Sequence, residues 1–177
     1  MTAPDGTPIL PAHLELLTSA DGLVIRRRWL SARVAGLILV AVFWNAFLIF
    51  WYTVAFRSGR PVTTGIFWFP LLHVAVGLGL IYGIVASFKN VTDITVSSTQ
   101  VRVASGPVPV PGNREVPVDS ITAIRLREIV GSKGSRSYRV VYVDRAMRQK
   151  TLLALPSRDQ AEYITATVRA TLGLPEA

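Results

Sequence analysis

His73 is the residue whose chemistry stands out, because it lies inside a long apolar segment. Ionisable side chains inside a membrane are costly and often serve proton transfer or ligand binding. Asn45 lies in a second apolar segment, and counting inward from Val34 and Phe88 puts the two side chains about 6 Å apart in depth. We therefore consider a direct or water-mediated hydrogen bond between them. Three interpretations of His73 stay open: a neutral side chain satisfied by a neighbouring helix, which we favour, a proton relay, and an axial ligand of a haem or pigment.

Other catalytic and metal-binding patterns are absent from the sequence. The chain has no cysteine and only two histidines, which argues against thiolate nucleophiles, disulfides and zinc sites. Gly131–Ser135 is superficially similar to a phosphate loop, but it lacks the first glycine and no helical pattern follows it, so we interpret it as a solvated hairpin tip. We therefore expect a protein without enzymatic activity, with no cofactor recruited by any residue other than His73.

Two apolar segments dominate the elements that would position these residues. Val34–Phe56 and Ile66–Phe88 each contain 23 residues without a charge, more than the ~20 residues that cross about 30 Å of hydrocarbon. The connection of nine residues, 57–65, makes the two helices antiparallel neighbours. Residues 1–33 lack the pattern of a cleaved signal peptide, so we expect the first span to remain in the mature protein. The sequence predicts a transmembrane hairpin over residues 34–88.

Basic residues beside the spans indicate an orientation. The connection between the spans holds Arg57 and Arg60, whereas the outer flanks hold five bases. Because Lys and Arg are retained on the cytoplasmic side, both termini are expected to be cytoplasmic. The net charge of +8 is spread thinly along the membrane flanks, which favours anionic lipid headgroups over nucleic acid as partners. The residues assigned to headgroup contact are Arg26, Arg27, Arg28, Arg33 and Lys89.

Small residues recur at every fourth position of the second span. They are Ala75, Gly79, Gly83 and Ser87. Such a stripe lets another helix approach closely. We favour contact with the first span within the hairpin; the alternative is packing on a partner membrane protein.

Residues 89–177 change to the alternating pattern of β-strands. Short apolar runs separated by turn residues predict a β-meander there. Gly106–Gly112 contains three prolines, so it is expected to be an extended edge or connector. Residues 157–172 show three- and four-residue apolar spacing behind a candidate N-cap, Ser157, and predict a terminal helix that caps the open end of the sheet.

The segment before the spans is also predicted to contain strands. Two short strand-like runs flank the turn Ser19–Gly22, which predicts a β-hairpin within residues 13–33. Residues 1–12 are rich in proline and lack apolar periodicity. We expect them to form a loosely ordered tail.

Motifs around the spans carry a resemblance to a known family. They are Arg26–Trp29 before the first span, Trp44 within it, His73 and Gly77–Tyr82 in the second span, Asn90–Thr92 after it, and Gly106–Gly112. On these motifs the chain resembles a family of bacterial membrane proteins with bacterial pleckstrin-homology-like (PH-like) domains. The resemblance implies two transmembrane helices inserted in a PH-like β-barrel or sandwich, capped by a C-terminal helix, in the bacterial cytoplasmic (inner) membrane.

The resemblance also implies a class of function. Some members resemble assembly factors or accessory subunits of photosynthetic and respiratory complexes, so we expect a non-enzymatic interaction protein whose partners are other membrane protein subunits. One alternative is a module that senses anionic lipid; another is a pigment or haem carrier that uses His73. The eukaryotic PH ligand site resembles a basic motif in the loop joining the first two strands, whereas Ser19–Gly22 has no base. The residues assigned to partner contact are Arg125, Arg127, Lys133 and Arg136.

Overall fold

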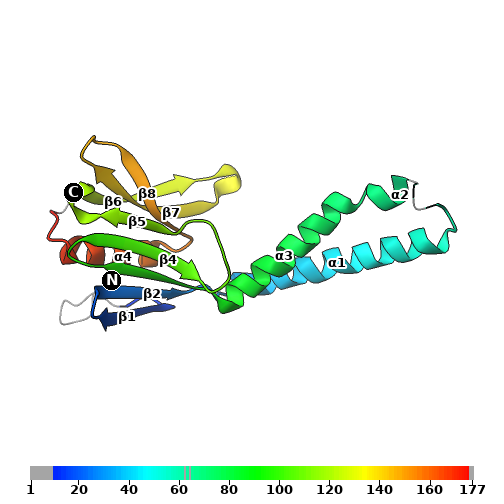
Figure 1. Ribbon diagram of the computed structural model, residues 1–177, viewed down its shortest axis with the longest axis horizontal. Helices are drawn as coiled ribbons and strands as arrows, with labels where there is room; N and C mark the ends of the chain where they lie inside the picture. The colour runs from blue at the N-terminus through cyan, green and yellow to red at the C-terminus, as the bar shows by residue number, and fades with distance from the viewer. Residues whose placement is uncertain (1–9, 62, 64, 176–177) are drawn as a thin grey trace. The chain divides into compact units, whose positions relative to one another are not determined.

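The computed structural model describes residues 10–61, 63 and 65–175, and the chain divides into two compact units. The β unit comprises Met1–Arg28 and Val91–Ala177, and the helical hairpin comprises Trp29–Asn90. Figure 1 shows the strands and the C-terminal helix in the β unit, and helices in the helical hairpin. The mixed α+β class with two long apolar helices, predicted from the sequence, is confirmed.

A five-stranded antiparallel sheet joins sequence from both sides of the helical hairpin. β2 pairs directly with β3, with Ile25 opposite Ile94, although the whole hairpin separates them in sequence. In spatial order the strands are β1 (Leu14–Ser19), β2 (Gly22–Arg28), β3 (Val91–Val96), β4 (Gln100–Gly106) and β5 (Arg114–Pro117). The proline-rich segment after Gly106 connects β4 to β5, as expected for a chain whose prolines cannot donate to a sheet.

A second sheet and a helix complete the β unit. The sheet contains β6 (Ile121–Val130), β7 (Arg136–Asp144) and β8 (Gln149–Leu155), in that order and all antiparallel. The last helix, α4 (Arg158–Thr171), presents an apolar face that includes Ile164 and Val168. Both of these side chains are fully buried, so the amphipathic spacing seen in the sequence is used for core packing.

One hydrophobic core holds the two sheets and α4 together. Ile25 and Ile94 of the first sheet, Val140 of the second and Ile164 of α4 each have 0% exposure and belong to the same cluster. The family resemblance implies a β-barrel or a sandwich. Within the described residues the sheets do not join into a closed barrel, so the expectation of a barrel is wrong. β5 has only four residues and ends at Pro117, which has no N–H to extend a ladder toward β6.

The segment before β1 lies only partly within the described residues. Residues 1–9 of the predicted tail lie outside them. Ala12, by contrast, is fixed: its carbonyl accepts a hydrogen bond of 2.8 Å from Gln160 Nε2 on α4. The part of the predicted tail next to β1 is therefore attached to the β unit.

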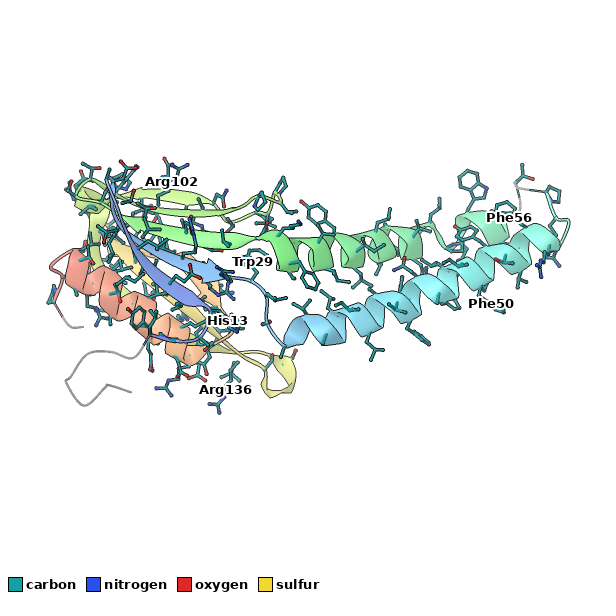
Figure 2. All side chains as sticks on the ribbon, turned by 90° about the horizontal axis from the view of Figure 1, so that it is seen from below. His13, Trp29, Phe50, Phe56, Arg102 and Arg136 are labelled. Atoms are coloured by element: carbon teal, nitrogen blue, oxygen red, sulfur yellow. The ribbon has the colours of Figure 1, made fainter. Side chains whose placement is uncertain are left out.

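The helical hairpin contains two helices long and apolar enough to cross a membrane, Val34–Arg57 and Gly65–Lys89. In detail they form α1 (Arg33–Arg57), a short α2 (Gly65–Trp68) and α3 (Leu71–Lys89). Many of their large apolar side chains are exposed, and Phe50 and Phe56 are among those labelled on α1 in Figure 2. Neither helix has the buried surface expected of a core helix in a soluble domain.

Side chains of α1 satisfy backbone carbonyls beside the break between α2 and α3. Pro70 has no N–H, so Ile66 O loses the donor that a continuous helix would supply four residues later. Trp51 Nε1 donates to this oxygen at 3.1 Å. Tyr52 Oη donates to Phe67 O at 3.2 Å in the same way. These aromatic donors fix α1 against the start of the returning helix, which explains how a proline is tolerated there.

Replacement of Trp51 by phenylalanine should destabilise the hairpin. Trp51→Phe keeps an aromatic ring but leaves Ile66 O without its side-chain donor, at a cost of about 1–3 kcal/mol for an unsatisfied group away from water. Thermal melting of the full chain in mild detergent, followed by circular dichroism, measures the loss.

The matched control is Trp68→Phe, because Trp68 is 59% exposed and its indole makes no hydrogen bond within the described residues. Adding Pro70→Ala to Trp51→Phe restores an N–H four residues after Ile66 and should recover most of the lost stability. Equal losses of stability from Trp51→Phe and Trp68→Phe would show that the lost hydrogen bond to Ile66 O does not cause the destabilisation.

Candidate functional site

His73 is packed between aromatic rings in the helical hairpin. Its ring stacks on Trp44 with centroids 5.6 Å apart and an interplanar angle of 19°, and Phe69 lies 6.0 Å away. Trp44 Nε1 donates to the backbone oxygen of His73 at 2.9 Å. Nδ1 of His73 is buried and has no hydrogen-bond partner among the described residues. Trp44 covers one face of the imidazole, which supports a packing role over ligation.

Asn45 does not form the hydrogen bond with His73 that its depth allowed. Its Nδ2 instead donates to Ala41 O at 2.8 Å, one turn earlier on α1. The side-chain oxygen of Asn45 faces Gly77, where a Cβ would lie only 2.7 Å away. Among the glycines of α3, Gly77 is therefore the one packed most closely against α1.

The small-residue stripe of α3 is placed differently from our favoured interpretation. Ala75 and Gly79 are exposed, and a Cβ built on Gly79 would meet no atom within 4 Å. Gly83 is half-buried, with Leu37 at 3.8 Å from its Cβ position, and Ser87 donates to Gly83 O at 2.7 Å. Contact within the hairpin is therefore wrong for Ala75 and Gly79, because α1 packs on the face that carries Gly77.

The arginines assigned to lipid headgroups at the end of β2 are largely engaged inside the β unit. Arg26 forms a two-pronged ion pair with Asp93 of β3, with both contacts at 2.8 Å, and this pairing raises the pKa of the Arg26 guanidinium. Arg27 Nε donates to Gln160 Oε1 on α4 at 3.1 Å, and burial lowers the pKa of Arg27. Both residues thus hold β2 to its neighbours, and Arg26 keeps 38% of its side chain exposed.

The remaining residues of that set are less constrained. Arg28 pairs with Glu15 at 3.0 Å but keeps 63% of its side chain exposed. Lys89, at the end of α3, is exposed. The side chain of Arg33 lies outside the described residues.

The residues assigned to partner contact lie on the β6–β7 hairpin. Arg125 and Arg127 are exposed on β6, and Arg136 begins β7, where its Nε lies 3.5 Å from Glu128. The side chain of Lys133, at the tip, lies outside the described residues. Sequence analysis missed Arg139, which the register places directly opposite Arg127. The signal was available, because pairing outward from the Gly131–Ser135 loop brings positions 127 and 139 together.

The β unit also contains an open hollow of about 400 Å³ at the Asp144 end of β7. Asp144 is 6% exposed and accepts hydrogen bonds from the backbone N–H groups of Ala146 and Arg148. Lys150 Nζ and Arg148 Nε lie 3.1 and 3.0 Å from its carboxylate. The backbone hydrogen bond from Arg148, reinforced by these cations, lowers the pKa of Asp144 to about 2. The Asp144 carboxylate is thus fully engaged in contacts that stabilise the β7–β8 turn.

Comparison with known proteins assigns no function to these surfaces. No protein-family model matches the chain, and no curated protein matches it. Within the described residues, no group of three or more His, Cys, Asp or Glu side chains comes together that could hold a metal ion. The candidate surfaces are therefore the open side of α3 and the basic β6–β7 hairpin.

Stability of the β unit should depend on Asp144 in acid. Its folded-state pKa of about 2 lies below the ordinary 3.8, so the stabilisation is fully present above about pH 4 and is lost as the pH falls toward 2. Asp144→Asn should therefore lower the melting temperature at neutral pH, and the difference from the unchanged chain should shrink between pH 4 and 2. Thermal melts followed by far-ultraviolet circular dichroism across this range measure it.

Asp119→Asn is the matched control. Asp119 lines the same hollow, but it is 74% exposed and 3.7 Å from Arg145, so its loss should change the melting temperature little at any pH. A difference between Asp144→Asn and the unchanged chain that stays constant down to pH 2 would contradict the assigned role.

Proposed function

We propose that this chain is a non-enzymatic interaction protein, an accessory subunit or assembly factor of a larger membrane complex. In this proposal the helical hairpin spans the bacterial inner membrane with both termini cytoplasmic, and the β unit is a PH-like platform at the cytoplasmic face. The observation that carries the proposal is the open side of α3. A small-residue surface that the chain's own partner helix leaves free is suited to a helix from another subunit.

The geometry of α3 separates its two small-residue surfaces. At Gly77 the space for a Cβ is filled by Asn45 and Leu48 of α1. At Gly79, two positions later, this space is open. Successive positions on a helix turn by about 100°, so residues 77 and 79 point to different sides. Close packing of α1 on α3 needs only the small residue at position 77. The second surface is thus available for a partner membrane protein.

Exposed apolar side chains support placement of the hairpin in a bilayer. Leu39, Phe43 and Leu72 are each more than 70% exposed. A soluble protein seldom exposes a contiguous apolar surface of this extent, because it would promote association in water. Lipid tails would cover these side chains without cost, and the basic flanks support cytoplasmic termini.

The arrangement of the β unit supports the PH-like assignment. Two antiparallel sheets and a C-terminal helix share one core, which is the sandwich that the family resemblance implies. The turn between β1 and β2 contains Ala20 and Asp21 and no base. A platform for proteins therefore fits this unit better than a receptor for inositol phosphates.

A bulky residue on the open side of α3 should break the complex. Gly79→Leu would hold a partner helix away from α3 and reduce the amount of co-purifying complex about tenfold, the effect of ~1.4 kcal/mol in binding. The test is a C-terminally tagged chain, isolated from native membranes in mild detergent, with its companions identified by mass spectrometry.

Gly36→Leu is the matched control, since Gly36 on α1 is also exposed and a Cβ there meets no atom within 4 Å. This variant should retain the companions. Isolation of the unchanged chain as a bare monomer at native expression would overturn the proposal, as would equal loss from both variants.

A further inference from the structure

The outer face of the five-stranded sheet balances its charges. Arg26 pairs with Asp93 at 2.8 Å, and Arg102 on β4 pairs with Glu115 on β5 at 3.0 Å. Arg28 likewise pairs with Glu15 at 3.0 Å. Each of these arginines thus has a carboxylate on a neighbouring strand, which is the usual way to place cations on a sheet.

The outer face of the three-stranded sheet is different. Arg127 on β6 lies directly opposite Arg139 on β7, and Arg125 lies on the same face two residues along. All three are exposed, and none forms an ion pair with a described residue. Like charges at directly opposite positions destabilise a sheet. No described carboxylate pairs with them, so these cations are available to an anion from outside the chain.

Positive charge is concentrated on the β6–β7 hairpin as a whole. Residues 125–139 contain five bases and one acid, Glu128, so this stretch carries +4 of the chain's net +8. The acid is already engaged, because Arg136 lies 3.5 Å from it. Half of the net charge of the protein therefore lies on one hairpin, so the expectation that it is spread thinly along the membrane flanks is wrong for this segment.

The same hairpin exposes an apolar side chain beside its tip. Val130, the last residue of β6, is 66% exposed, and the Gly131–Ser135 loop follows it. Arg127 lies three residues from Val130, about 10 Å along a strand. An apolar side chain flanked by cations is the pattern of segments that bind the surface of an anionic membrane.

Short chain connections tie the end of the β unit that carries this hairpin tip to the two long helices. Figures 1 and 2 both show the β6–β7 tip at the end of the β unit where β2 finishes and β3 begins. Only Trp29–Ala32 separate β2 from α1, and only Asn90 separates α3 from β3. If the helices span a bilayer, this end of the β unit is tethered within a few residues of the headgroups.

We propose that the β6–β7 hairpin is an anionic-lipid contact. Val130 enters the interface between headgroups and acyl chains, while Arg127 and Arg139 bind lipid phosphates. Each cation at the surface contributes about 1 kcal/mol, or roughly fivefold in the contact equilibrium. This contact goes beyond binding of a partner by α3, and it would orient the platform against the membrane.

The absence of cysteine allows a direct test. Val130→Cys places one label on the tip, and Met147→Cys places one at the opposite end of β7, where Met147 is 75% exposed. The full chain is labelled with an environment-sensitive fluorophore and placed in bilayer nanodiscs of phosphatidylcholine, with or without phosphatidylglycerol. We expect a blue shift and protection from aqueous iodide at position 130 in anionic discs only, weakened by high salt, with position 147 quenched in all discs.

Charge variants then assign the contact to the arginines. Arg127→Gln with Arg139→Gln should weaken the contact roughly 25-fold, bringing quenching at position 130 to the level of position 147. The variant removes a like-charge repulsion, so its melting temperature should not fall. Arg102→Gln with Arg158→Gln removes the same charge from other exposed sites of the β unit and should leave the contact intact.

Three results would each overturn the proposal. One is equal quenching of positions 130 and 147 in anionic discs, which would instead leave the arginines for an acidic protein. Another is equal protection in neutral discs. The third is an equal loss of contact in the two charge variants. All of these readouts use bilayers without other proteins, so they are independent of whether Gly79 binds a partner.

Discussion

The pairing of β2 with β3 is the constraint on which the rest of the chain depends. Arg28 lies opposite Val91, yet the whole helical hairpin separates them in sequence. The two long helices must therefore leave and return at one place, which requires an even number of passes through any membrane. The core has the same dependence, because Ile25 from before the hairpin packs with Ile94 and Ile164 from after it.

Much of this architecture could be predicted from the sequence because its signals are local. Uninterrupted apolar runs give the long helices, and the amphipathic pattern after Ser157 gives α4 to within one residue at each end. Barrel closure could not be predicted, since it depends on how far a ladder continues between two specific strands. The barrel stays open because β5 is short and ends at Pro117.

The candidate sites were less predictable because residue type does not reveal direction. The stripe at every fourth position of α3 could face α1 or away, and only packing shows that Gly77 is the buried contact. Arg26 and Arg27 match the basic flank of a span, yet Asp93 and Gln160, remote in sequence, engage them. Four of the five bases on the β6–β7 hairpin could be named from the sequence. Register was needed to find Arg139.

The separation of β2 from β3 also sets an order of events during synthesis. Ribosomes add about 5–20 residues per second, so β3 follows β2 by about 3–13 s. Throughout that interval β1 and β2 exist as a lone hairpin, which is at best marginally stable in water, with Ile25 uncovered and one edge unpaired. The β unit therefore completes itself last, after both long helices have left the ribosome, and its early strands need protection until then.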